Sequence, residues 1–406
     1  MRVSIAGRDA DPVHLTYCLN VYPGITWPEV QANIERHVLK HKQRFSPDRP
    51  FGVGLRLAGE ASSEILRGDE LVKFRDYLDA HGLYVFTMNG FPYGPFHGQA
   101  VKADVHAPDW RDDERVAYTL RLIQALADLL PDGMDGGIST NPFGYLPFID
   151  TGDRAMWQLF VERMVLIAER LYRVRQADGK LIHLDIEPEP DGVLGDCGEL
   201  IAFYEQWLLP LGVPLLAVRL GLDDDAARAV MLEHIRVCFD TCHVGVSYED
   251  PATILARFDE LGIKVGKIQV SSALKLDLGE PGQRGMLATE LAQFDEPIYL
   301  HQVIQRNTDG SLVHYPDLPE ALPHIDEPEA EEWRIHFHVP IFVDAFEHFG
   351  STQDTITQTL DVLAKTGFTN HLEIETYTWD VLPAELKQDL DESVAREYQW
   401  VLDAIR

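Results

Sequence analysis

The chain has 406 residues, of which 66 are acidic and 35 basic, and its formal net charge is −31. Hydrophobic residues make up 45% and charged residues 25%, which is typical of a globular protein and excludes general disorder. The strong negative charge argues against a nucleic acid or an anionic membrane surface as a partner, because both would repel this protein.

Short runs rich in β-branched and aromatic residues alternate with segments of helical periodicity along the chain. The predicted strands span residues 14–19, 51–57, 83–89, 136–140, 181–187, 236–240, 265–271 and 371–375. The predicted helices span residues 26–44, 69–80, 113–130, 154–175, 199–209, 251–261, 352–365 and 389–405. Eight alternating units predict a (β/α)8 TIM barrel. An open doubly wound sheet is the alternative, and the lack of a glycine-rich phosphate loop disfavours it.

A long connection, residues 272–350, separates the seventh predicted strand from the eighth. It contains a hairpin pattern with a turn at Asp309-Gly310. Long connections within a domain are usually functional, and barrel enzymes have their active sites at the carboxyl ends of the strands. We therefore expect a single domain, residues 1–406, in which residues 272–350 form an insertion that serves as an active-site lid.

Polar side chains occupy the ends of several predicted strands. Glu187 and Glu375 are the last polar positions of two strands with alternating polarity, and Asp240 ends a third strand three residues before His243. Period two places Lys267 and Gln269 on one face of another strand, and His336 and His338 on one face of a segment in the insertion. Strand ends converge in a barrel, so these carboxylates require protonation, a cation or basic partners. Glu187, Asp240, Gln269 and Glu375, with one or two of the histidines, predict an oxygen-rich divalent-metal site.

Aromatic residues spaced by glycine and proline follow the third predicted strand. Asn89 ends this strand, and Phe91 and Tyr93 lie in the loop, while Tyr17 lies on the first strand. These residues either wall a pocket or pack the loops onto the barrel. We expect the substrate-binding residues to be His243, His336, His338, Asn89, Phe91, Tyr93, Tyr17 and Lys267.

The strings LDIEPEP, CFDTCH, KIQVS and HLEIET resemble the xylose isomerase-like superfamily of sugar isomerases, epimerases and family-2 AP endonucleases. The strings TYCLNVYPG, FTMNGFPYGPFHG and HLEIETYTWDVLP resemble EboE-type proteins, which are encoded in the Ebo clusters linked to metabolite traffic. The second resemblance covers essentially the whole chain.

The superfamily resemblance implies roles for the strand-end residues. Glu187 would bind the metal and act as an acid and base, Asp240 would be a second ligand, and Glu375 would be the glutamate of the last strand. His243 would bind the substrate or a further metal. Gln269 stands where relatives normally have a histidine ligand, and an amide is a weaker ligand than imidazole for a transition metal.

These features predict an isomerase or epimerase that depends on a divalent metal (Mn, Mg or Zn) and acts on a sugar-like or polyhydroxylated metabolite. A non-catalytic protein that binds or hands on a metabolite is the alternative, and Gln269 favours it. The net charge of −31 disfavours a DNA-repair nuclease. No signal peptide and no stretch of about 20 apolar residues are evident, so we expect a cytoplasmic protein without a membrane span. Its expected partners are a small-molecule metabolite and other Ebo-cluster proteins.

Overall fold

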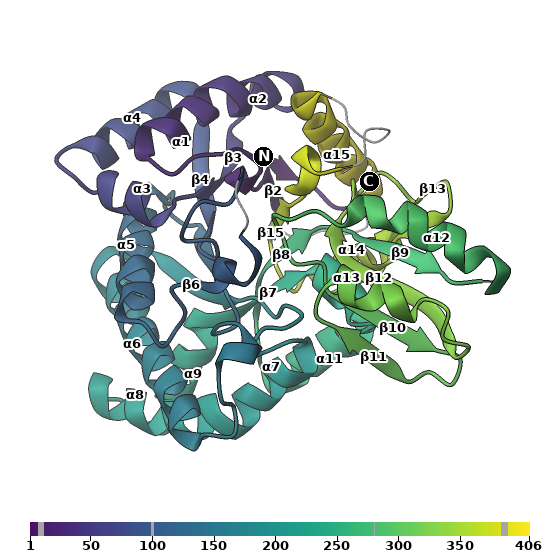
Figure 1. The fold of residues 1–406 in the computed structure, drawn as a ribbon. Coiled ribbons are helices and arrows are strands. Elements are labelled where there is room, and N and C mark those ends of the chain that lie inside the picture. The colour runs from purple at the N-terminus through teal and green to yellow at the C-terminus, as the bar shows by residue number, and fades with distance from the viewer. Residues whose placement is uncertain (7–11, 99–100, 280, 383–388) are drawn as a thin grey trace.

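Eight parallel strands form the centre of the fold and close into a barrel (Figure 1). The computed structural model describes residues 1–6, 12–98, 101–279, 281–382 and 389–406. The strands are neighbours in the order β2, β15, β8, β7, β6, β5, β4, β3, and a parallel bridge between Cys18 and Gly54 joins the two ends of this series. Their bounds are β2 Val13–Tyr17, β3 Phe51–Arg56, β4 Leu83–Asn89, β5 Asp135–Thr140, β6 Leu181–Ile186, β7 Ile235–Asp240, β8 Val265–Val270 and β15 His371–Ile374.

This arrangement confirms the predicted barrel, since each predicted strand corresponds to one barrel strand. A short additional strand, β1 (Arg2–Val3), pairs antiparallel with β2. Buried apolar side chains fill the space between the strands and the surrounding helices. The helices around the barrel are α1 Trp27–Asn33, α2 Leu39–Phe45, α3 Gly59–Glu64, α4 Glu70–His81, α5 Asp113–Leu129, α6 Arg154–Asp178, α7 Cys197–Phe203, α8 Val213–Leu220, α9 Asp224–His234, α10 Thr241–Val246, α11 Pro251–Leu261, α14 Gln353–Thr366 and α15 Leu390–Ala404.

A local sequence signal explains where α1 begins. Thr26 and Glu29 form a capping box at the start of α1, in which the Glu29 carboxylate accepts hydrogen bonds from the backbone N–H groups of Ile25 and Thr26. One π-helical segment, Ile34–Val38, joins α1 to α2. The predicted helix 26–44 is therefore a continuous helical segment with a local change of winding.

One helical stretch is more apolar than expected. Residues Cys197–Leu220, which comprise α7, the π-helical segment Tyr204–Gly212 and α8, are long and apolar enough to cross a membrane by length and composition. The expectation that no stretch reaches this length was therefore wrong. Leu200 and Leu208 of this stretch are buried in the hydrophobic core, which accounts for part of its apolar character.

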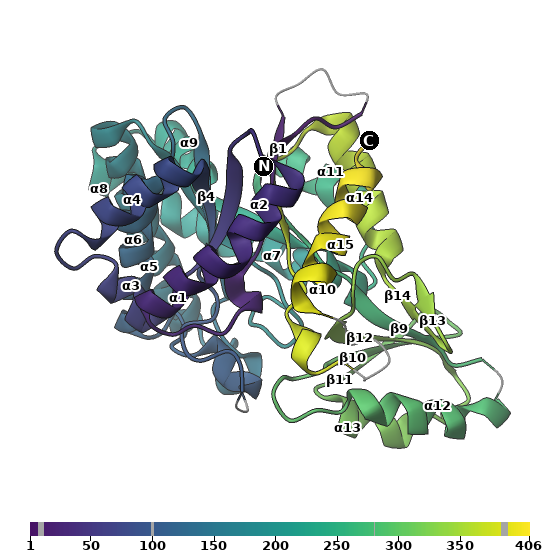
Figure 2. The same cartoon turned by 90° about the horizontal axis from the view of Figure 1, so that it is seen from above.

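The insertion forms a second sheet beside the barrel. Its antiparallel strands lie in the order β11, β10, β12, β9, β14, β13, at the end of the molecule away from both termini (Figure 2). The predicted hairpin is confirmed, because β10 pairs with β11 and Gly310 lies in the turn with a φ of 84°. The bounds of its elements are β9 Ala273–Asp277, α12 Arg284–Leu291, β10 Val303–Asn307, β11 Leu312–Tyr315, α13 Leu318–Ala321, β12 Ala330–His338, β13 Ala345–Phe346 and β14 Phe349–Ser351.

The barrel interior contains charged groups below the strand ends. The Lys267 ammonium group of β8 donates a hydrogen bond to the Glu373 carboxylate of β15, and both side chains are fully buried. A Cβ atom on Gly54 would lie 2.1 Å from Glu373 Oε1, so glycine on β3 is needed to leave room for this ion pair. The pairing satisfies two charges that would be costly to bury separately.

The carboxyl group of Glu397 is buried on the inner face of α15, and its titration makes the free energy of unfolding depend on pH. Burial raises its pKa from 4.5 to about 7, despite hydrogen bonds from Tyr17, Thr376 and the backbone N–H of Ile341. The folded protein therefore retains a proton that the unfolded chain has lost between these pH values, and the free energy of unfolding falls as pH rises through this range.

Replacing Glu397 by Gln should remove this dependence. Relative to the wild type, Glu397→Gln should gain about 3 kcal/mol in its free energy of unfolding between pH 4.5 and pH 8. Urea denaturation at the two pH values measures the difference. An equal difference between the two proteins at both pH values would contradict the assignment.

Candidate functional site

Three carboxylates meet at the carboxyl end of the barrel. Asp240 is the last residue of β7, and Glu187 and Glu375 directly follow β6 and β15. One oxygen of each side chain lies within 4.8 Å of the others, and the three residues are at most 4% exposed. The structure thus brings together the three predicted acidic ligands, as expected for strand ends that converge in a barrel.

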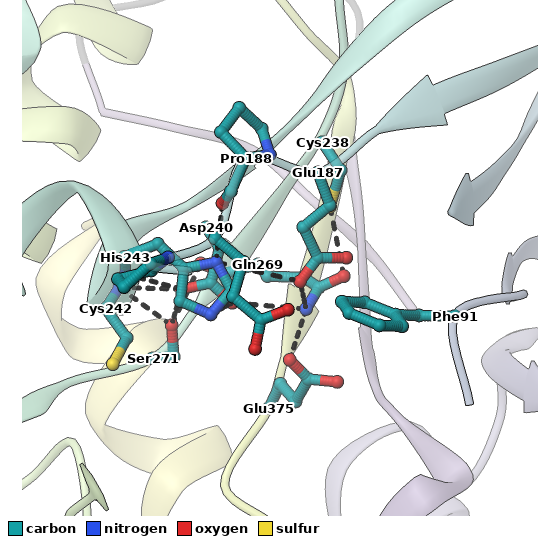
Figure 3. A network of polar contacts seen from close by, with 12 residues as sticks. Phe91, Glu187, Pro188, Cys238, Asp240, Cys242, His243, Gln269, Ser271 and Glu375 are labelled. Carbon is teal, nitrogen blue, oxygen red and sulfur yellow. Dashed lines mark hydrogen bonds and ion pairs between the residues drawn. The ribbon is translucent and has the colours of Figure 1, made fainter. Parts of the chain in front are cut away.

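The side-chain amide of Gln269 lies between these carboxylates (Figure 3). Its nitrogen donates to Glu187 Oε1 and to Asp240 Oδ2, each at 3.2 Å, and to Glu375 Oε2. Its oxygen accepts a hydrogen bond from the Cys238 thiol at 3.0 Å. The sheet register explains this position, since Gln269 of β8 pairs with Asp240 of β7.

Glu375 is held by two further amides. Asn20 Nδ2 and Asn89 Nδ2 donate to Glu375 Oε1 at 2.6 and 2.9 Å. Burial raises the pKa of Glu375 to about 8, and the nearby charge of Asp240 acts in the same direction. Burial also raises the pKa of Glu187 well above its usual range. The negative charges of Glu375 and Asp240 raise it further.

Asp240 differs from the two glutamates in its hydrogen bonds. Its Oδ1 accepts from the Ser271 hydroxyl at 2.6 Å and from the backbone N–H groups of Cys242 and His243 at 2.7 and 3.2 Å. Burial acts to raise its pKa, but His243, His338 and these donors outweigh burial and lower it. Asp240 is therefore the group of the three that most readily carries a negative charge.

Three histidines lie beside the carboxylates with their orientation fixed by hydrogen bonds. His243 Nδ1 lies 2.8 Å from Pro188 O, and His338 Nδ1 lies 2.7 Å from Glu375 O. A carbonyl oxygen only accepts, so in both rings Nδ1 carries the hydrogen. His336 Nδ1 lies 2.9 Å from Gln302 Oε1 in the same way.

The Nε2 atoms of His336 and His338 are available to a ligand. Both atoms are buried and have no hydrogen-bond partner among the described residues. Burial lowers the pKa of His338 to about 4 and that of His336 well below its usual range, so both rings are neutral near pH 7. A neutral ring with a free nitrogen can accept a hydrogen bond or bind a metal.

The histidines join further groups with the spacing of metal ligands. Glu189, His243 and His336 offer atoms within 4.8 Å of one another. The same spacing is found for Asp240, His243 and His338, and for Cys242, His336 and His338. A metal at the carboxylates would have oxygen ligands, whereas these groups are richer in nitrogen and sulfur.

A cavity opens above the carboxylates. Phe96, Tyr299 and Tyr377 line it, and their rings pack in tilted and edge-to-face arrangements with centroids 5.0 to 5.3 Å apart. Lys102 also lines the cavity, where it forms an ion pair of 2.7 Å with Asp317 of the insertion. The predicted site residues that line the cavity are Glu187, Glu375, His243, His336, His338, Asn89 and Phe91.

Three predicted substrate-binding residues lie outside the cavity lining. The Tyr17 hydroxyl donates to Glu397 at 2.7 Å, and the Tyr93 hydroxyl donates to Glu114 at 2.9 Å. Lys267 is fully buried below the carboxylates in its pair with Glu373. The structure thus gives each of these polar groups a partner elsewhere.

Some polar residues of the lining were not among the predicted site residues, and they include His106, Glu189 and Gln302. Glu189 directly follows the Glu187-Pro188 pair, and its Oε2 lies 3.7 Å from His106 Nε2. The EPEP string was the signal that could have identified Glu189. His106 ends a short 3-10 helix, Lys102–His106, and Gln302 lies just before β10, where no periodicity indicates direction.

The donor set at the three carboxylates fits a divalent cation. Three carboxylates provide the oxygen ligands that Mg²⁺ and Mn²⁺ prefer. Glu187 Oε2 is buried and has no hydrogen-bond partner among the described residues. An unpaired buried carboxylate oxygen of this kind is well suited to a cation, because it has none of its lone pairs satisfied.

Comparisons with known proteins give structural matches. No protein-family model and no curated protein matches the chain. It is similar to the solved structure of IolI protein with a bound zinc atom, with 12% identity, a TM-score of 0.47 and coverage of 97% of this chain and 98% of that chain. The probable 3-DHS dehydratase AsbF of Bacillus anthracis is similar with 9% identity, a TM-score of 0.44 and coverage of 96% and 98%. A xylose isomerase domain protein of Alicyclobacillus acidocaldarius is similar with 10% identity, a TM-score of 0.44 and coverage of 96% and 99%.

The hydroxyl of Ser271 provides a test of the carboxylate site. Ser271→Ala removes the donor that orients Asp240, and we expect the affinity for Mn²⁺ to fall about tenfold. Isothermal titration calorimetry measures the affinity. Ser272→Ala is the matched control, because Ser272 is buried next to Ser271 and its hydroxyl has no hydrogen-bond partner among the described residues. Equal Mn²⁺ affinities of the two variants would contradict the role given to Ser271.

Proposed function

We propose that the protein is an isomerase or epimerase that depends on a divalent metal and acts on a sugar-like, polyhydroxylated metabolite. The observation that carries the proposal is the group of three buried carboxylates, Glu187, Asp240 and Glu375, of which Glu187 and Glu375 line a cavity. The aromatic wall of the cavity suits the apolar face of a sugar, and its amides and neutral imidazoles suit hydroxyl groups.

Glu187, Asp240 and Glu375 would hold the metal. The amide oxygen of Gln269, which faces Cys238 in this structure, would join them only after the amide turns. A divalent cation bound there would polarise a carbonyl group and a neighbouring hydroxyl of the substrate. Asp240 contributes the most stable negative charge of the set, because three donors bind its Oδ1.

Glu187 and Glu375 are the residues that we assign to proton transfer. Both line the cavity, and they lie on opposite sides of the Gln269 amide, which donates to each of them. One carboxylate would remove a proton from the carbon beside the carbonyl, and the other would return a proton to the neighbouring position. Asn20 and Asn89 orient Glu375 for this step through its Oε1.

The histidines would position the substrate. The Nε2 atoms of His336 and His338 can accept hydrogen bonds from hydroxyl groups, since their Nδ1 atoms carry the hydrogens. This interaction would distinguish a polyol from an apolar molecule of the same shape, because an apolar ligand would leave the buried ring nitrogens unpaired.

A non-catalytic metabolite-binding protein is the second candidate. The Gln269 amide, which already supplies a donor to all three carboxylates, favours it. The EboE-like strings support a place in an Ebo pathway with other Ebo-cluster proteins as partners for either candidate. The two candidates differ in proton exchange, since a binding protein would take up the metabolite without exchanging its hydrogens with the solvent.

Proton exchange tests the acid and base assignments. A panel of ketohexoses is incubated in D₂O with the purified protein loaded with Mn²⁺, and mass spectrometry follows deuterium uptake. We expect at least one sugar of the panel to exchange a carbon-bound hydrogen with the solvent. Glu187→Gln and Glu375→Gln should each reduce the rate at least about 100-fold, because each removes one proton-transfer group.

Glu332→Gln is the control, because Glu332 is buried in the insertion sheet and lies outside the cavity lining. It should retain the wild-type rate. Exchange at the wild-type rate in both cavity variants would refute the acid and base assignment. Failure to bind Mn²⁺, Mg²⁺ or Zn²⁺ would refute the metal-dependent reaction itself.

A further inference from the structure

The Gln269 amide nitrogen occupies the point at which the three carboxylates meet (Figure 3). It donates to Glu187, Asp240 and Glu375, one oxygen of each being its acceptor. A cation bound by the same three oxygens would lie about 2.0 to 2.6 Å from each of them. The amide nitrogen and a cation therefore compete for the same oxygens, and both cannot bind them in this orientation of Gln269.

The other end of the amide faces a group that can bond to either of its atoms. Cys238 Sγ lies 3.0 Å from Gln269 Oε1, and both side chains are fully buried. A thiol is a weak donor and also a weak acceptor. If the amide turns by 180° about its last side-chain bond, Oε1 faces the carboxylates and Nε2 faces the sulfur. The contact with Cys238 is retained in both orientations, with donor and acceptor exchanged.

We propose that Gln269 is a two-position amide that replaces the cation in the metal-free protein and becomes an oxygen ligand when the cation binds. Cys238 is the positioning residue, because its thiol can form a hydrogen bond with the amide in either orientation. The inference rests on the proposed metal site, and it adds that Gln269 determines which metal the site prefers.

The proposal has a consequence for the choice of metal. In the turned orientation, the carboxylates and the amide offer only oxygen atoms, which favours Mg²⁺ and Mn²⁺. Imidazole at the same position would favour Zn²⁺. Gln269 therefore sets a preference for hard cations at the carboxylates, separately from the nitrogen-rich groups formed by the histidines.

Two measurements test the two parts of the proposal. Mn²⁺ bound to chelator-treated protein is followed by electron paramagnetic resonance, and Zn²⁺ is added until half of the Mn²⁺ is displaced. Gln269→His should lower the Zn²⁺ concentration required at least about tenfold. In the ¹⁵N spectrum, the side-chain NH₂ signals of Gln269 are assigned as those that disappear in Gln269→His. Adding Mg²⁺ to the wild type should shift these signals.

Cys238 provides the second set of variants. Cys238→Ala removes the acceptor of the turned amide and should weaken Mn²⁺ binding about tenfold. Cys238→Ser should remain within about threefold of the wild type, because a hydroxyl also donates and accepts. Cys197→Ala is the matched control, since Cys197 is a buried cysteine at the start of α7, outside the Gln269 network, and it should bind Mn²⁺ like the wild type.

The outcomes separate this inference from the proposed function. If the wild type binds Mn²⁺, and Gln269→His leaves the Zn²⁺ displacement unchanged or Cys238→Ala binds Mn²⁺ like Cys238→Ser, the two-position amide is refuted and the metal site stands. If the Gln269 signals do not shift with bound Mg²⁺, the turn of the amide is refuted. If the wild type binds no cation, the proposed function fails, and this inference fails with it.

Discussion

Negative charge in a confined, buried space is the constraint on which the site depends. Several carboxylates cannot all stay ionised there without a compensating group, so their environment divides them into different states. His243, His338 and hydrogen-bond donors outweigh burial and lower the pKa of Asp240, whereas burial raises the pKa of Glu187 and Glu375. Gln269 links all three through one amide nitrogen. The same arrangement offers a place for a divalent cation, and the hydrogen bonds from the Gln269 amide reduce the cost of burying the three carboxylates together.

The barrel and the insertion contribute different chemistry to the cavity. The barrel strands end in acids and amides, which are oxygen donors and hydrogen-bond donors. The insertion brings His336 and His338, whose free ring nitrogens are acceptors. Aromatic rings from both parts, such as Phe96 and Tyr299, close the edge. The cavity lining therefore combines polar groups from both parts with aromatic rings.

The period-two pattern predicted the barrel and its acidic residues, because alternation and strand ends are local properties that the closed sheet retains. It did not distinguish depth along the barrel. Gln269 and Lys267 share a face of one strand, yet Lys267 lies one layer lower, where Glu373 neutralises it. Residues outside the barrel strands, such as Glu189 and Gln302, could not be placed in this way, since their direction depends on packing between segments far apart in sequence.

The ring of His338 has a role in the architecture as well as in the cavity. Its Nδ1 binds the backbone oxygen of Glu375, and the Thr378 hydroxyl donates to the backbone oxygen of His338. The insertion and the segment after β15 are thus tied together at the residue that carries one of the carboxylates. Removing residues 272–350 to make a smaller barrel would leave Glu375 without this support, so the insertion is part of the frame of the site and not an interchangeable cover.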